Sequence, residues 1–97
     1  MEEILLKLNE RNTGAFYLMD GETEMGQMEI GIRGSVMTVY HTEVKPEFEG
    51  KGLAKKLFNE MVSYARNNQL KVIAICPYVH AQFKRHAEEY KDIWEKK

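Results

Sequence analysis

The sequence predicts an α+β domain with a mostly antiparallel sheet and one parallel pair of strands. Up to residue 44, apolar and polar side chains alternate with the period of two that is typical of strands. Residues 53–65 instead repeat apolar side chains on one helical face. At 97 residues the chain is long enough for one modest hydrophobic core, so we expect a single domain over residues 1–97.

Four antiparallel strands are expected before residue 45. The segments EILLKLNE and AFYLMD form the first two, and the turn-forming pair Asp20-Gly21 separates the second from EMGQMEIGIR. Arg33-Gly34-Ser35 closes the next hairpin, and VMTVYHTEV carries the β-branched and aromatic residues of a central strand. The economical arrangement of these four strands is a meander.

A helix, a strand and a second helix follow. The apolar run LKVIAICPY predicts a buried strand that Pro77 stops. A right-handed crossover would make this strand the parallel neighbour of the strand that ends at residue 44. The second helix is expected over residues 80–94. The first helix ends at Asn67-Asn68, and its apolar face consists of Leu53, Leu57, Phe58, Met61 and Ala65.

Composition limits the classes of partner. The formal net charge of -1 lacks the excess of basic residues expected of a general nucleic-acid binder, so nucleic acid is not an expected partner. Cys76 is the one cysteine and cannot form an internal disulfide, which favours a reducing compartment, and we predict the cytoplasm. No apolar run reaches membrane-spanning length, and the acidic start MEEILLKLNE does not resemble a secretory signal, so no membrane partner is expected.

A glycine-containing loop separates the fourth strand from the first helix. Gly50-Lys51-Gly52 is not a P-loop, because it lacks the earlier spaced glycine and the Ser or Thr that would hold magnesium. It is not the dinucleotide fingerprint either, because residues 53–55 provide no third glycine. Loop amides at the positive end of a helix suit a phosphate without a metal. A tight turn that requires positive φ explains the same glycines, and the spacing alone does not choose between the two.

The stretch VKPEFEGKGLAKKL resembles the acyl-CoA loop of the GNAT superfamily of N-acetyltransferases. The family pattern is Gln or Arg, two residues, Gly, one residue, then Gly or Ala, and it runs here from Glu49 through Gly52 to Ala54. The motifs HTEV and CPYV, followed by His86 and Tyr90, are similar to a group of small stand-alone GNAT-like proteins over residues 13–94. Two features differ: Glu49 stands where Gln or Arg is usual, and HAEEY replaces a shorter His-Pro-Glu-Tyr.

The resemblance implies a GNAT-like core with a splayed sheet, two helices and a cleft for acetyl-CoA, the co-substrate. It also implies transfer of the acetyl group to an amine acceptor such as a protein or peptide. Full-size members of the family usually place one or two helices between their first two strands as the wall of the acceptor site, whereas only NERNTG lies there in this chain. The resemblance therefore implies that the acceptor side is open or is closed by a partner chain, and monomer and homodimer both stay possible. The alternative is an acyl-CoA-binding module for sensing or scaffolding with little turnover. The implied cofactor-binding residues are Val44, Glu49, Gly50, Lys51, Gly52, Leu53 and Ala54.

Cys76 and two residues of the fourth strand are candidates for the chemistry. At the end of the strand that lines the cleft, Cys76 could accept the acetyl group or protonate the leaving sulfur, although a buried core cysteine is the plainer interpretation. His41 could act as a base or lower the pKa of Cys76, or it could be a half-buried strand histidine. Glu43 shares a face with His41, whereas Thr42 points the opposite way. The main chain of Glu43 and Val44 could bond pantetheine, with the Val44 amide as a candidate oxyanion donor.

Either Tyr90 or His86 could protonate the leaving thiolate, and Tyr90 is the candidate catalytic residue. It lies four residues after His86, so the two side chains would meet on one helix face, a spacing that ordinary helix packing also produces. No metal site is predicted, because no pair has a recognised ligand spacing within the conceivable zinc set of His41, His80, His86 and Cys76.

Overall fold

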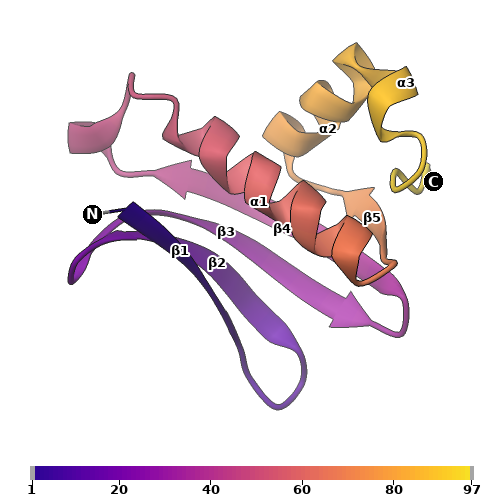
Figure 1. The fold of residues 1–97 in the computed structure, drawn as a ribbon, viewed down its shortest axis with the longest axis horizontal. Helices are drawn as coiled ribbons and strands as arrows, with labels where there is room; N and C mark the ends of the chain where they lie inside the picture. Colours follow the sequence, from indigo (N-terminus) through magenta and orange to yellow (C-terminus); the bar gives the residue numbers. More distant parts are fainter. Residues whose placement is uncertain (1, 97) are drawn as a thin grey trace.

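The computed structural model describes residues 2–96 as a five-stranded sheet with helices (Figure 1). The strand order is β1-β2-β3-β4-β5, with antiparallel pairing from β1 to β4 and parallel pairing of β4 with β5. This arrangement confirms the predicted α+β class, the meander and the single parallel pair. The elements in chain order are β1 Glu2–Leu8, β2 Thr13–Asp20, β3 Thr23–Arg33, β4 Val36–Val44, the 3-10 helix η1 Pro46–Phe48, α1 Leu53–Asn67, β5 Lys71–Ala74, α2 Pro77–Arg85 and α3 Ala87–Tyr90.

The helices share one hydrophobic core with one face of the sheet. In Figure 1, α1 runs along β4, with the β1–β2 hairpin on one side of it and α2 and α3 on the other. Phe58 of α1 is fully buried, and its ring makes edge-on contacts with Phe83 at 5.7 Å and Tyr90 at 5.3 Å between centroids. Aromatic pairs of this geometry add to the gain from burial. These contacts attach α2 and α3 to the side of α1 opposite the β1–β2 hairpin. They thereby hold the segment that follows β5 in place.

The predicted final helix over residues 80–94 is interrupted, so three α-helices replace the two expected. α2 begins at Pro77, whose fixed φ suits the first helical position, and it ends where His86 adopts φ -124° and ψ 49°. After α3 the chain returns to the sheet: the Val72 amide donates to the Ile93 carbonyl, and Trp94 forms a bridge with Val72. A continuous helix could not provide these bonds, which explains why the periodic sequence does not form one.

A β-bulge divides β4 into two segments. Ile30 pairs with Val39, whereas the preceding Glu29 pairs with His41, so Tyr40 is the extra residue. A bulge of one residue reverses which side chains face the core. Val39 is therefore buried against the helices before the bulge, and Thr42 faces them after it.

Candidate cofactor and acyl-transfer site

The loop between η1 and α1 contains two glycines in the left-handed region. Gly50 has φ 84° and Gly52, the N-cap of α1, has φ 73°. An added Cβ would meet no atom within 4 Å at either position, so the backbone conformation and not crowding requires glycine. The loop is the tight turn that the sequence allowed, and it brings main-chain amides to the start of a 15-residue helix.

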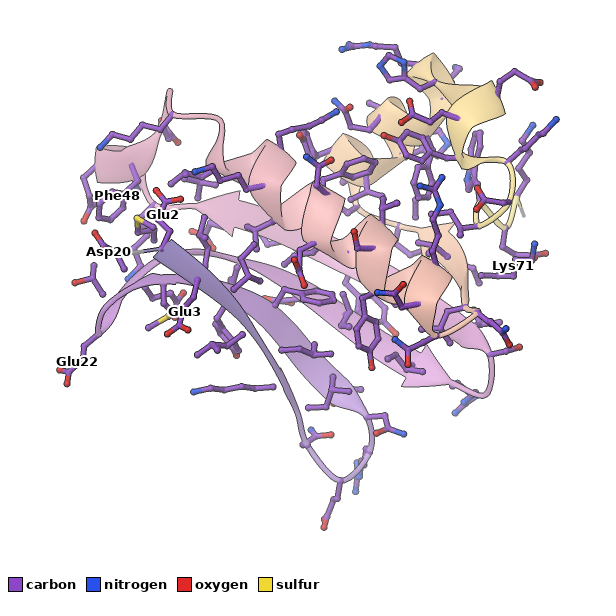
Figure 2. All side chains as sticks on the ribbon, in the orientation of Figure 1. Glu2, Glu3, Asp20, Glu22, Phe48 and Lys71 are labelled. Atoms are coloured by element: carbon purple, nitrogen blue, oxygen red, sulfur yellow. The ribbon has the colours of Figure 1, made fainter. Side chains whose placement is uncertain are left out.

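A small hollow of about 170 Å³ opens on this loop. Every predicted cofactor-binding residue except Lys51 lines it, together with Phe48, which sequence reasoning did not include. The Lys51 ammonium lies nearby, 5.8 Å from the centre of the Phe48 ring. Figure 2 shows Phe48 at the end of the molecule where the chain leaves β4. A large apolar residue in an otherwise polar loop was the available signal for it. The lining residues are Val44, Phe48, Glu49, Gly50, Gly52, Leu53 and Ala54.

The parallel neighbour of β4 ends before β4 reaches this loop. β5 pairs with β4 only over Val36–Val39, and the amides of Ile75 and Cys76 both donate to the Val39 carbonyl, at 3.0 and 2.9 Å. β5 ends at Ala74, the partner of Val39, so beyond Val39 the edge of β4 that faces away from β3 has no strand partner among residues 2–96. The predicted opening beside β4 is therefore present, and it arises because β5 ends there.

Main-chain amides of β4 point into this opening. The Lys45 amide donates to the Met25 carbonyl of β3, and successive amides of a strand point to opposite edges. The amides of Val44 and Thr42 therefore face the open edge. An acyl chain with amide groups could bond there as an added strand would.

Cys76 lies two residues beyond the end of β5, beside the open edge of β4. It is only 2% exposed, it precedes the first residue of α2, and its sulfur lies 3.3 Å from Oγ1 of Thr42 across the opening. Either atom can donate this hydrogen bond. The thiol is therefore both a member of the core cluster and a neighbour of the open edge of β4.

The structure does not bring His41 to Cys76. His41 and Glu43 are exposed, and within the described residues neither side chain has a hydrogen bond or an ion pair. The two side chains share a face, as expected, but this face is opposite to the one that carries Thr42 and its contact with Cys76. The predicted interaction of His41 with the Cys76 thiol is therefore replaced by that of Thr42.

Two tyrosines differ in their relation to this opening. Tyr90 is 4% exposed and packs between the rings of Phe58 and Phe83, and burial is the main cause that raises its pKa. Burial also raises the pKa of Tyr78, with a smaller electrostatic contribution from Cys76. The phenol of Tyr78 therefore stays protonated to higher pH than that of an ordinary tyrosine. Sequence reasoning overlooked Tyr78, although its place two residues after Cys76 in CPYV was a usable signal.

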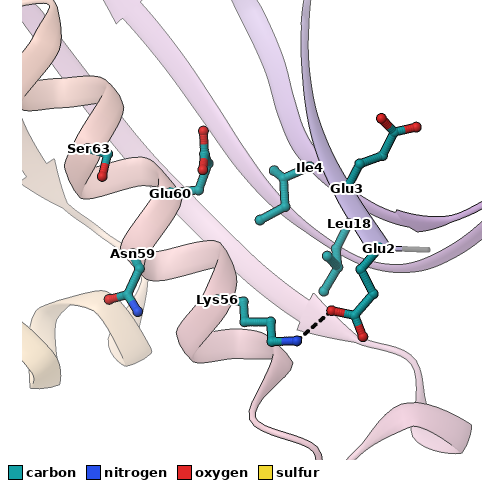
Figure 3. A pocket seen from close by; sticks show the side chains of 8 residues that line it. All are labelled: Glu2, Glu3, Ile4, Leu18, Lys56, Asn59, Glu60 and Ser63. Carbon is teal, nitrogen blue, oxygen red and sulfur yellow. Dashed lines mark hydrogen bonds and ion pairs between the residues drawn. The ribbon is translucent and has the colours of Figure 1, made fainter.

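A second hollow, of about 380 Å³, lies between β1 and α1 (Figure 3). Glu2 and Lys56 form an ion pair across it, and Glu3 and Glu60 also line it. It includes none of the predicted site residues. Within residues 2–96 no three His, Cys, Asp or Glu side chains gather as metal ligands, and no helix is long and apolar enough to cross a membrane.

The family model described as GCN5-related N-acetyl-transferase matches residues 15–93. The chain belongs to the GCN5-related N-acetyltransferase family. The matched region contains β4, the glycine loop, α1 and Cys76, so the resemblance noted in the sequence is confirmed over the whole candidate site. A comparison with curated proteins found no match.

Solved structures of the same fold include three of different size. The solution structure of a proposed GCN5-like N-acetyltransferase from Staphylococcus aureus has 29% identity and a TM-score of 0.71, covering 98% of this chain and 89% of that one. A ribosomal-protein-alanine N-acetyltransferase from Brucella melitensis biovar Abortus has 19% identity and a TM-score of 0.64, over 91% of this chain and 65% of that one. PaiA N-acetyltransferase from Thermoplasma acidophilum, solved in complex with coenzyme A, has 16% identity and a TM-score of 0.54, over 80% and 50%. The last two show likeness of fold alone.

Proposed function

We propose that this protein binds acetyl-CoA and transfers the acetyl group to an amine. One observation carries the proposal: the hollow on the glycine loop adjoins the unpartnered edge of β4, which leads to Cys76. Membership of the GCN5-related N-acetyltransferase family supports the same reaction class. The alternative, a CoA-binding module with little turnover, would use the same hollow and edge.

The loop and β4 would hold different parts of the co-substrate. The amides from Gly50 to Ala54 suit the pyrophosphate, because a helix N-terminus presents unsatisfied donors and a partial positive charge. Lys51 adds a full positive charge beside the hollow. The amides of Thr42 and Val44 suit the pantetheine arm, which would lie along β4 as a further strand.

Acetyl-CoA would supply the thioester carbonyl that the amine attacks, and its sulfur would leave as a thiolate. Of the amides of Val44 and Thr42, the one that is not bonded to the pantetheine arm can stabilise the negative charge on the carbonyl oxygen. Tyr78 would give its proton to the leaving sulfur as the carbon–sulfur bond breaks. His41 and Glu43 are exposed and can accept the proton that the amine loses as its bond to carbon forms.

Calorimetry with acetyl-CoA, followed by an acetyl-transfer assay on mixed peptides, tests this function. Binding followed by appearance of acetylated peptide and free CoA thiol is the expected result. Binding without any transfer would favour the module that senses or scaffolds. If acetyl-CoA does not bind to the folded protein, both functions are wrong.

Replacement of Glu49 by Arg is expected to tighten acetyl-CoA binding about fivefold at low salt. Glu49 lines the loop hollow, where a carboxylate complements the dipole of α1 and competes with the pyrophosphate for it. An arginine removes this competition, and its attraction should weaken as salt shortens the Debye length. Titrations at several salt concentrations measure the effect, with Glu10→Arg in the β1–β2 turn as the control of equal charge change. Unchanged affinity of Glu49→Arg at low salt would contradict the proposed phosphate site.

Replacement of Cys76 by Ala is expected to lower turnover far more than it weakens acetyl-CoA binding, if the thiol takes part in the reaction. The sulfur lies 3.3 Å from Thr42 at the opening, so it can reach an acyl group held along β4. Intact-protein mass spectrometry after incubation with acetyl-CoA would show whether acetyl remains on the protein. An unmodified protein together with a fully active Cys76→Ala variant would make Cys76 a core residue only.

A further inference from the structure

The face of the sheet opposite the helices carries a third hollow, of about 500 Å³. It spans β2, β3, β4 and β5, and its lining includes Thr38 and Ile73, which alternate with the core residues of their strands. The three exposed large apolar side chains of residues 2–96 are Leu5, Tyr40 and Ile75. Leu5 and Ile75 stand between core-facing neighbours, whereas Tyr40 stands between the core residue Val39 and the exposed His41. Within the described chain this face therefore has a concave surface that mixes polar and apolar side chains, with no helix packed on it.

Tyr40, the bulge residue, forms one wall of this hollow. Its side chain lies over Gly31 of β3, because a Cβ on Gly31 would come within 3.3 Å of Tyr40 Cε2 and 3.4 Å of its hydroxyl oxygen. Tyr40 is still 49% exposed, so much of the side chain remains available to a ligand. Tyr40 directly follows Val39, the last residue of β4 that pairs with β5, so this wall of the hollow stands beside the point where the open edge of β4 begins.

Charges of opposite sign lie on the two sides of Tyr40. Arg11 and Arg33 line the hollow, and within residues 2–96 neither guanidinium has a hydrogen bond or ion pair with a carboxylate. Beyond Tyr40, Glu29 pairs in register with His41 and is exposed, again without an ion pair in the described chain. Glu29 and Arg33 are four residues apart on one strand, which corresponds to about 13 Å.

We propose that the acceptor is a peptide segment that lies on this face of the sheet. Its amine would lie at the opening beside Tyr40, and one of its acidic side chains would bind to Arg11 and Arg33. This inference rests on the proposed acetyl transfer. The arginines suit a carboxylate, which a guanidinium can bind through two parallel hydrogen bonds. Glu29 and Glu43 attract the ammonium form of the amine before its proton is lost. An extended peptide spans 13 Å in about four residues, so the acidic residue should stand three to five positions from the acetylated amine.

The acidic preference is tested with peptides of one sequence that carry Glu, Gln or Lys four positions after an acceptor amine. We expect kcat/KM to fall about tenfold from Glu to Gln and further to Lys. In Arg11→Glu/Arg33→Glu the order should reverse, so that the Lys peptide becomes the better acceptor. Lys84→Glu is the control, because it also replaces a positive charge by a negative one but lies on α2, outside the hollow. This variant should keep the wild-type order of kcat/KM among the three peptides. Equal kcat/KM for the three peptides would overturn the inference.

A second readout separates this inference from the proposed function. Fluorescence anisotropy of labelled peptides measures their binding without turnover, and calorimetry measures acetyl-CoA affinity in each variant. Gly31→Ala should weaken binding of the Glu peptide by displacing Tyr40, while acetyl-CoA affinity stays unchanged. If acidic peptides bind in an arginine-dependent way but no acetyl is transferred, the surface is correct and the transfer is wrong. If acetyl transfer occurs without charge preference, or a single-stranded oligonucleotide binds better than the Glu peptide, the acidic peptide is the wrong occupant.

Discussion

Gly52→Val is expected to lower acetyl-CoA affinity by at least a hundredfold in a protein that still folds. Gly52 has φ 73°, a conformation that β-branched side chains resist, and it caps α1 beside the loop hollow. Valine would either shift the loop amides away from their common direction or place its methyl groups where the pyrophosphate is proposed to bind. Isothermal titration with acetyl-CoA measures the loss, and thermal unfolding checks that the fold is kept.

Gly34→Val is the matched control. Gly34 also has positive φ, 59°, with no atom within 4 Å of an added Cβ, but it lies in the β3–β4 hairpin away from the loop. Both substitutions should destabilise the protein by about 1–2 kcal/mol through backbone strain. Only Gly52→Val should lose the ligand. Similar acetyl-CoA affinities in the two variants would reduce the glycine loop to a structural turn.

The parts of the fold that the sequence predicts well are those with a strong local signal. Hairpins at Gly21 and Gly34 follow from turn residues, and both glycines have the positive φ that such turns require. The change of period after Leu53 marks α1, whose buried residues include all five predicted for its apolar face. The strand after α1 is expected to be the parallel neighbour of β4, because a strand–helix–strand unit with a right-handed crossover commonly places its strands so, and the pairing confirms this.

The arrangement of the catalytic candidates depends on a feature without a local signal. The bulge at Tyr40 contains no glycine, and nothing in VMTVYHTEV distinguishes it from a regular strand. Strict alternation correctly places His41 and Glu43 on one face of β4 and Thr42 on the other. It does not predict which of the two faces contacts Cys76. That choice depends on the register with β3, which is a tertiary property.

The choice between Tyr78 and Tyr90 also depends on tertiary structure. The interruption at His86 directs α3 back over α1, so Tyr90 fills the aromatic cluster around Phe58. A continuous helix would have carried the same tyrosine along a different path. Tyr78 stays near Cys76 because Pro77 starts α2 directly after that residue, which is a constraint of chain connectivity. Family spacing indicated the tyrosine after His86, but Tyr90 is 4% exposed within the aromatic cluster, so we propose the tyrosine after Cys76 instead.

Tyr78→Phe is expected to lower kcat for acetyl transfer about a hundredfold or more with little change in acetyl-CoA affinity. General acid catalysis of carbon–sulfur bond breakage typically contributes a rate factor of this size, and Tyr78→Phe removes it. The phenylalanine ring keeps the edge-on contact with Phe58, at 6.2 Å between ring centroids. Tyr90→Phe is the matched control, because Tyr90 also packs on Phe58 and also has a raised pKa. It should keep the kcat of the wild type. A large loss in Tyr90→Phe and none in Tyr78→Phe would restore Tyr90 as the donor.

The pH dependence of kcat gives an independent check on the same residue. A proton donor must be protonated to act, and burial raises the pKa of Tyr78, with a smaller electrostatic contribution from Cys76 and with Arg85 opposing the shift. The donor therefore stays active to higher pH than an ordinary tyrosine, and the wild-type kcat should fall only above the pH at which a free tyrosine ionises. Removal of the positive charge in Arg85→Gln should move this fall to still higher pH. An alkaline fall that persists unchanged in Tyr78→Phe would show that another group provides the proton.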